Sequence, residues 1–415
     1  MIRRIYQPVL GLFAAVLIVA NCGSSSGTQT TSTASQTSVK TTGATATSTT
    51  STTTVQSNVS LQDLSWTGAT DGWALYSKVC SKAPCPAHLA YTTNGGASWK
   101  QLPNPPVDLQ LAGYPLCSKS TCVSHVRFAN QNDGYLYGSS FLITTDGGQS
   151  WKAQQGPKVE TLKVADNKVF RVTSTGVGCS SLCKPILQGS SPGSVTWKTL
   201  VAGLSHPSQF STAQFASSGS TILLALYGNE AGGVSAQAHV YRSDDKGATW
   251  NLMSDPCSGN GPGASGLEED LIGLAAAPGG FFAGLCSPHA GFATFLIHST
   301  DGGKQWSLAG TVPRSDDLQL LAAASPTTLV ASSGVAAGEG PYTARLLISF
   351  NGGKTWKTAA TDEQKLTQLT VPAWLGFETS IVGRWISGPN SLWTTNDGGL
   401  QWAKTALDLS TGYLG

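Results

Sequence analysis

The chain has 415 residues, of which 12% are charged, and its formal net charge is +2. This low and balanced charge provides neither the basic field that nucleic acid requires nor an acidic excess that would attract a cationic partner. Beyond residue 60 the sequence has almost no helical periodicity and no apolar stretch long enough to span a membrane. These features favour a mostly β protein that does not bind nucleic acid.

The first 22 residues have the organisation of an export signal. Arg3 and Arg4 form a basic start, and residues 9–20 form a short apolar core. The segment ends at Asn21 and Cys22, which resembles a bacterial lipobox with Cys22 as the lipidated residue, although Asn21 stands where a small residue is usual. We therefore expect export and a lipid anchor on Cys22 at the outer surface of the cell membrane, with ordinary secretion or an uncleaved anchor as the alternative.

Residues 23–58 form a Ser/Thr-rich segment. It has 23 Ser or Thr among its 36 residues, and Lys40 is its only charged residue. Because this composition cannot bury a core, we expect a disordered tether with a root-mean-square reach of about 30–35 Å. Three regions are thus predicted, namely a signal peptide over 1–22, the tether over 23–58 and a folded domain over 59–415.

An eight-residue phrase is repeated along the folded domain. It begins with Ser or Thr, has Asp or Asn at the third position and Gly at the fifth, and ends with Trp. A seventh, degraded copy over 190–197 has Pro192 in place of the acid and Ser194 in place of the glycine. Neighbouring copies are 46–56 residues apart, a period that is typical of solenoids and propellers, and their tryptophans are Trp99, Trp151, Trp197, Trp250, Trp306, Trp356 and Trp402.

Each phrase lies between two short strand-like runs, as in residues 141–143 before the second copy and 151–153 after it. An Asp or Asn next to Gly between apolar runs is a strong hairpin signal, since Gly accepts the positive φ of the turn. Two further runs precede this hairpin, at 123–128 and 134–138. The sequence therefore predicts seven four-stranded antiparallel blades, closed radially into an all-β propeller.

The phrases resemble the Asp-box, or BNR repeat, of sialidases, sortilin-type receptors, some xyloglucan hydrolases and photosystem II assembly factors. Asp-Gly-Trp at 71–73 and Asp-Gly-Tyr at 133–135 are similar to the blade openings of the photosystem assembly family. The resemblance implies a propeller and leaves the activity open, because one fold hosts many functions. It also implies a structural role for each closing tryptophan and for the acid or amide of each intact copy, which are Asn94, Asp146, Asp245, Asp301, Asn351 and Asp397.

The chain has nine cysteines. Without Cys22 there are eight, an even number that can pair in an oxidising compartment. Their spacing is poor for tetrahedral zinc and no histidine pair accompanies them, so we expect no metal and no cofactor. Three pairs are predicted because their cysteines are close in the sequence, and the fourth because its two cysteines are the ones that remain. The predicted disulfides are Cys80–Cys85, Cys117–Cys122, Cys179–Cys183 and Cys257–Cys286.

Antiparallel blades have two distinct faces. The seven phrases and the turns between first and second strands share one face, the turn face. The loops between second and third strands and the links between blades share the opposite face, the link face. Cysteine-bounded and long segments fall on the link face, where binding residues are expected. The candidates are Tyr114, Glu230, Glu268, Asp270, Arg314, Asp317, Tyr342, Arg384 and Trp385, with His206 and Glu339 nearby.

Two functions fit these observations. The first is a monomeric, non-enzymatic propeller that binds an extracellular protein or glycan through the link face. The alternative is an extracellular glycoside hydrolase, sialidase-like or using a carboxylate pair, because two acids at the required spacing can come from any loops. Its candidate catalytic residues are Glu268, Asp270, Asp316 and Asp317.

Overall fold

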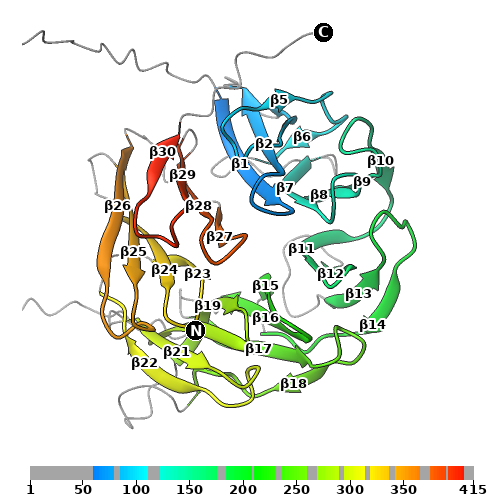
Figure 1. Ribbon diagram of the computed structural model, residues 1–415. Helices are drawn as coiled ribbons and strands as arrows, with labels where there is room; N and C mark the ends of the chain where they lie inside the picture. Colours follow the sequence, from blue (N-terminus) through cyan, green and yellow to red (C-terminus); the bar gives the residue numbers. More distant parts are fainter. Residues whose placement is uncertain are drawn as a thin grey trace, which may run out of the picture. The chain divides into compact units, whose positions relative to one another are not determined.

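The structure, a computed structural model, is an all-β propeller of seven four-stranded antiparallel blades, as the repeat predicts (Figure 1). The propeller lies within residues 55–415. Within the described residues, no helix is long and apolar enough to cross a membrane. The predicted signal peptide and tether lie outside the described residues, which are 59–78, 85–110, 122–174, 184–207, 210–229, 235–258, 269–288, 294–313, 318–335, 342–364, 374–388 and 391–405.

The first strand of each blade lies next to the central channel and the fourth lies at the rim (Figure 1). Blades 1 to 3 consist of β1 (Val59–Trp66), β2 (Gly72–Lys78), β4 (His88–Thr92) and β5 (Lys100–Gln101); β7 (Cys122–Phe128), β8 (Gly134–Gly138), β9 (Phe141–Thr144) and β10 (Lys152–Gln154); and β11 (Lys158–Ala165), β12 (Lys168–Ser174), β13 (Ile186–Ser190) and β14 (Lys198–Val201).

The remaining four blades repeat this order of strands. They consist of β15 (Phe210–Ser218), β16 (Thr221–Asn229), β17 (Ser235–Ser243) and β18 (Asn251–Met253); β19 (Glu269–Ala277), β20 (Phe281–Pro288), β21 (Phe295–Ser299) and β22 (Ser307–Thr311); β23 (Leu318–Ala323), β24 (Leu329–Val335), β25 (Tyr342–Ser349) and β26 (Lys357–Gln364); and β27 (Trp374–Phe377), β28 (Gly383–Gly388), β29 (Ser391–Thr395) and β30 (Ala403–Thr405).

Blade 2 has two additional short strands. β6 (Asp108–Leu109) pairs in parallel with β7, and β3 (Cys85–Pro86) pairs with β6. β6 comes from the chain that follows blade 1, and β3 comes from the segment between β2 and β4 of blade 1; together they extend the sheet of blade 2 beside its inner strand. The first two blades are therefore joined by backbone hydrogen bonds as well as by side-chain packing.

The inner strands share a register shift near their start. In β1 the shift lies between Leu61 and Asp63, and the inner strands β7, β11, β15, β19 and β23 have one at the corresponding place. A bulge of this kind inserts one residue, bends the strand and reverses which side chains face each side. It therefore decides which residues of each inner strand line the channel.

The repeated phrase folds into a turn stabilised by its own side chains. In blade 2, Thr144 Oγ1 donates to Asp146 Oδ1 (2.7 Å), and Thr144 Oγ1 accepts from the N–H of Gly148 (3.0 Å). The same carboxylate accepts from the N–H of Ser150 at 2.9 Å. Gly147 and Gly148 have φ of 75° and 93°, a left-handed conformation that explains the glycines.

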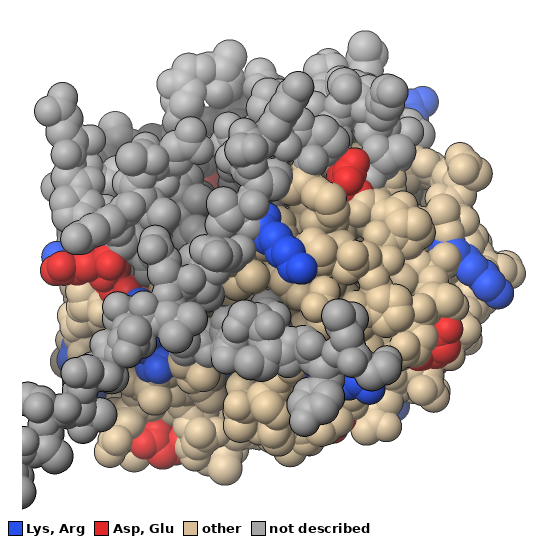
Figure 2. All heavy atoms as spheres, turned by 90° about the horizontal axis from the view of Figure 1, so that it is seen from above, with Lys and Arg blue, Asp and Glu red and all other residues tan. Residues whose placement is uncertain are grey.

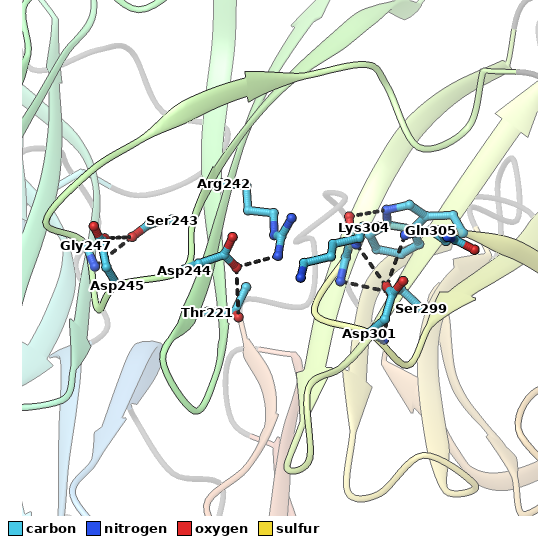
Figure 3. Close-up of polar contacts among 12 residues, drawn as sticks. Thr221, Arg242, Ser243, Asp244, Asp245, Gly247, Ser299, Asp301, Lys304 and Gln305 are labelled. Atoms are coloured by element: carbon cyan, nitrogen blue, oxygen red, sulfur yellow. Dashed lines mark hydrogen bonds and ion pairs between the residues drawn. The ribbon is translucent and has the colours of Figure 1, made fainter.

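The same arrangement recurs in blades 4 and 5 (Figure 3). Ser243 and Asp245 point toward each other in one turn, and Ser299 and Asp301 do so in the next, at 2.8 and 2.7 Å. In the intact copies an N–H of the turn also donates to a carbonyl of the first turn of the blade, as Gly302 does to Gly280 at 3.0 Å. The two kinds of turn therefore do share one face, as predicted.

Each closing tryptophan packs toward the preceding blade. Trp250 of blade 4 meets Phe170 of blade 3 with ring centroids 5.9 Å apart, and Trp306 joins a cluster with Leu223 and Val240 of blade 4. We expected Trp306 to be buried, but all seven tryptophans are only partly buried. The reason is their position at the blade edge, where one side of each ring remains exposed.

The ring closes where blade 7 meets blade 1, and Arg384 of β28 is the main polar contact there. Its Nη2 donates to the carbonyls of Ala69 (3.0 Å) and Gly95 (3.1 Å) in blade 1. Its guanidinium lies 3.4 Å from the ring centroid of Trp66, and Nη1 is 2.6 Å from Glu378 Oε2. Both side chains of this ion pair are almost fully buried, with 1% and 5% of their surface exposed.

Candidate functional site

The central channel contains a cavity. Its volume is about 930 Å³, and side chains from the inner strands of all seven blades line it. The lining residues come from different levels of the inner strands, from residues 211–215 near the start of β15 to residues 64–66 at the end of β1. The cavity therefore extends along the channel.

One part of the channel wall contains a buried acid with two basic neighbours. Asp63 is 1% exposed, and its Oδ2 accepts from Arg127 Nη1 at 2.7 Å and from the N–H of Val126 at 3.0 Å. The Nδ1 of His125 lies 3.3 Å from the same oxygen. Burial by itself raises the pKa of the Asp63 carboxyl, but Arg127 and these hydrogen bonds outweigh burial and hold that pKa below its usual range.

The neighbouring strand β11 contributes Glu160 and Lys163 to the lining. Glu160 is paired with Lys158, at 2.8 Å, and accepts from the hydroxyl of Ser174. Lys163 has no hydrogen bond or ion pair within the described part of the chain. Burial lowers the pKa of the Lys163 amine, and the positive charge of Arg127 lowers it further. The blade 2 and blade 3 side of the channel is therefore basic.

The opposite side of the channel is apolar. Ile272 of β19, Leu320 of β23 and Leu375 of β27 line it, together with the rings of Trp374 and Phe377. The strands β23 and β27 lie across the channel from β11 (Figure 1). The cavity thus has a basic wall and an apolar wall that face each other.

A second polar cluster lies at the link face between blades 4 and 5. Asp255 accepts from the N–H groups of Cys257 (2.8 Å) and Ala238 (3.1 Å), and it is near the buried Asp270 of β19. Burial raises the pKa of the Asp255 carboxyl to about 6, and the negative charge of Asp270 contributes to the rise. Sequence reasoning missed Asp255, because no repeat or spacing signals an acid that follows β18.

The predicted disulfide Cys257–Cys286 is present, with Cα atoms 5.6 Å apart. It fastens the link between blades 4 and 5 to the end of β20, beside Asp255. Cys85 and Cys122 are also disulfide-bonded. The remaining cysteines of the predicted pairs, Cys80, Cys117, Cys179 and Cys183, lie outside the described residues.

The structure places three of the predicted binding residues differently from the expected loops. Asp270 lies in β19 and is 2% exposed. Arg384 and Trp385, which we expected in a loop of the link face, lie in strand β28 and are fully buried. Arg384 reaches the turn face of blade 1, so its expected place near the link-face opening is wrong. A buried side chain that bridges two blades is held by the fold and presents little surface to a partner.

Most of the other predicted site residues cannot be compared. The side chain of Tyr342 falls outside the described set, although its backbone begins β25. The residues that lie wholly outside the described ranges are Tyr114, Glu230, Glu268, Arg314, Asp316, Asp317 and Glu339.

The described surface offers no other obvious site. On the side seen in Figure 2, charged side chains are scattered over a largely uncharged surface. No group of three or more His, Cys, Asp or Glu side chains that could hold a metal ion occurs within the described residues.

Comparison with known proteins supports the fold class. No family model matches the chain, and no curated protein does either. A structure of YCF48 bound to D1 peptide is 18% identical with a TM-score of 0.50, and the match covers 82% of this chain and 94% of that chain. YCF48 from Cyanidioschyzon merolae is 13% identical with a TM-score of 0.50, over 83% of this chain and 97% of that chain.

A Hadza microbial sialidase is a more distant match. It is 13% identical with a TM-score of 0.41, and the match covers 84% of this chain and 66% of that chain. At such low identity, likeness in structure speaks for a shared propeller fold and leaves function open.

Proposed function

We propose that this protein is an exported, lipid-anchored propeller that binds a protein or glycan through its link face without catalysing a reaction. The observation that carries the proposal is the Cys257–Cys286 bridge, which fastens a blade-to-blade link to β20 on that face. A fastened link loses little conformational entropy when a partner binds, which favours recognition. The similar propeller YCF48 was solved bound to D1 peptide, which supports a peptide segment as one kind of partner.

The surroundings of the link-face acids support binding over catalysis. Asp255 is 6% exposed, and backbone N–H groups of three different segments, at Ala238, Cys257 and Leu271, donate to it. A carboxylate committed to several backbone donors joins segments of the fold and is a poor proton donor to a substrate. The acid is therefore a support for the link that carries Cys257.

Two half-exposed lysines on opposite faces test the proposal. Lys158 starts β11 at the link face and pairs with Glu160, whereas Lys246 lies in a repeated turn and pairs with Asp166. We expect Lys158→Glu to weaken binding of the full chain to arrayed peptides or glycans, and Lys246→Glu to leave binding unchanged. If Lys246→Glu weakened binding more than Lys158→Glu, or if both variants lost binding equally, the link face would be excluded as the binding surface.

A glycoside hydrolase is the second candidate, because Asp255 has a pKa of about 6 and lies beside another buried acid, Asp270. A general acid in a glycosidase needs such a raised pKa. Hydrolysis of a polysaccharide panel by wild type, Asp255→Asn and an Asp270→Asn/Asp317→Asn double variant separates the two functions. Turnover by wild type that disappears in the variants, with unchanged melting, would establish the hydrolase and reject the binding-only role.

A further inference from the structure

We propose that the channel contains a carboxylate-binding subsite at Lys163 and Arg127, which takes a ligand with one carboxylate on an apolar body. Arg127 and Lys163 lie in the second halves of β7 and β11, toward the turn face, whereas the surface proposed above lies on the link face. Its ligand is defined by the chemistry of the two facing walls.

The charge balance of the lining identifies Lys163 as the anchor. The described acids of the lining are Glu160 and Glu378, and each already faces its own cation, Lys158 and Arg384 respectively. Lys163 is left with a positive charge that no described acid balances. Placing an unbalanced ammonium in a partly desolvated wall is unfavourable unless an anion joins it.

Arg127 completes the subsite. Its Nη1 is occupied by Asp63, Leu64 and Val126 oxygens, which fix the guanidinium in the wall beside Lys163. Its side chain nevertheless remains 28% exposed, and its charge acts on Lys163. The charge of Arg127 is already paired with Asp63, whereas that of Lys163 is not, so a carboxylate at Lys163 gains a charge-assisted hydrogen bond.

The opposite wall determines the chemistry of the ligand beyond its carboxylate. Ile272, Leu320 and Leu375 face the channel from β19, β23 and β27. A volume of about 930 Å³ lies within the range of sites that bind small ligands, and here an apolar wall faces a wall with polar and charged groups. A ligand that carried a second charge would have to bury it against these aliphatic side chains, which is costly. The ligand class is therefore an apolar monocarboxylate.

Two sources share this chemistry, a fatty acid and the free C-terminus of an apolar peptide. Titration calorimetry of the full chain with octanoate and with acetyl-Leu-Leu addresses both sources. Octanamide and acetyl-Leu-Leu-amide serve as uncharged counterparts of the same shape. We expect at least one acid to bind about tenfold or more tightly than its amide, because a hydrogen bond to a charged group is stronger than one to a neutral group. The acid that binds identifies the source.

Three variants make the test specific. Lys163→Gln should remove the preference for the acid, whereas Lys163→Arg, which keeps the charge, should retain most of it. Lys152→Gln makes the same charge change in the exposed outer strand β10 and should have no effect. Equal binding of acid and amide, an unchanged preference in Lys163→Gln, or no binding of either acid would each overturn the subsite. These results leave the link-face proposal standing, because binding to arrays tests it separately; Lys158 itself does not line the cavity, but its partner Glu160 does.

Discussion

At the scale of single residues, the repeated turn shows which parts of the phrase are interchangeable. In blade 1, Asn94 replaces the acid, yet Ser98 still donates its N–H to Asn94 Oδ1 at 2.9 Å. The amide then donates to Ser98 Oγ at 2.8 Å, which reverses the direction of one bond in blade 2, where the Ser150 hydroxyl donates to Asp146. The turn therefore requires an acceptor oxygen at the third position and does not require a charge.

This comparison predicts the effects of substituting Asp146. Asp146→Asn should change the unfolding free energy little, because Asn forms the equivalent bonds in two other blades. Asp146→Ala should cost about 1–2 kcal/mol, since it leaves N–H groups of the turn without their acceptor. Urea denaturation of both variants measures the difference. Equal losses would show that charge matters more than the acceptor.

The tryptophans of the intact and degraded phrases should also differ. Trp306 donates its indole N–H to Gly303 at 3.0 Å and packs against blade 4, so Trp306→Ala should cost about 2–4 kcal/mol. Trp197 of the degraded copy lacks this bond, as do Trp99, Trp151 and Trp402 of intact copies, and it contacts Arg171 and Phe141. We therefore expect Trp197→Ala to be milder. Thermal melts that ranked the two variants equally, or in reverse, would contradict this.

At the scale of elements, the link between blades 4 and 5 is stabilised by a buried acid and a disulfide together. The Asp255 carboxylate accepts hydrogen bonds from the N–H of Ala238 in β17 and from the N–H of Cys257. Cys257 in turn forms a disulfide with Cys286 of β20. Three elements thus meet at one carboxylate. Burial makes ionisation of that carboxylate unfavourable, so the junction should depend on pH.

The pKa of Asp255 fixes the direction of this dependence. Its folded value, about 6, lies above the ordinary 3.8, so the folded protein binds more protons than the unfolded chain between these values. This contribution to stability is complete below about pH 4 and is lost as pH rises through 6, a change of about 3 kcal/mol. Asp255→Asn should flatten the wild-type slope of unfolding free energy across this window.

A control separates this effect from general acid titration. Asp166 is 40% exposed and pairs with Lys246 on the opposite face. Asp166→Asn makes the same substitution at an exposed acid away from the junction and should keep the wild-type slope between pH 4 and 7. Denaturation curves at several pH values compare the three proteins, and a slope unaltered in Asp255→Asn would refute the assignment.

At the scale of the whole molecule, the sequence predicted the ring of seven blades. It did not predict which side chains line the channel or which contacts close the ring. Seven evenly spaced phrases predict seven blades, because each phrase forms a turn by local bonds. The side chains that face the channel follow a bulge in most inner strands, and a bulge reverses the alternation that sequence reasoning relies on. Lys163 and Arg127 were therefore not recognised.

The closing junction was missed for a related reason. Arg384 was predicted to lie in a loop, but its partners Ala69 and Gly95 are 315 and 289 residues away in the sequence. No local pattern signals a contact of that range. Within the described residues, β30 pairs only with β29 and β1 only with β2, so side chains join blades 7 and 1. At this junction the described chain also does not run on from one blade to the next.

Substitution of Arg384 should therefore open the ring at a specific place. Arg384→Ala leaves Glu378 buried without its cation, which typically costs about 3–5 kcal/mol. Because burial already raises the pKa of Glu378 to about 7, the carboxyl can take up a proton at lower pH, and the cost should be smaller at pH 5 than at pH 8. Arg384→Met combined with Glu378→Leu should recover much of the loss, since it removes both buried charges.

Hydrogen exchange distinguishes an opened ring from general destabilisation. In Arg384→Ala, amides of β1 and β27 should exchange faster than those of β15 in the opposite part of the ring, because only the closing junction lost a contact. Arg171→Ala provides the comparison, since Arg171 also stacks on a blade-edge tryptophan, 4.0 Å from the ring of Trp197, but at a junction where the chain itself continues. Faster exchange spread evenly over all seven inner strands in Arg384→Ala would show that the junction is no weaker than the other six.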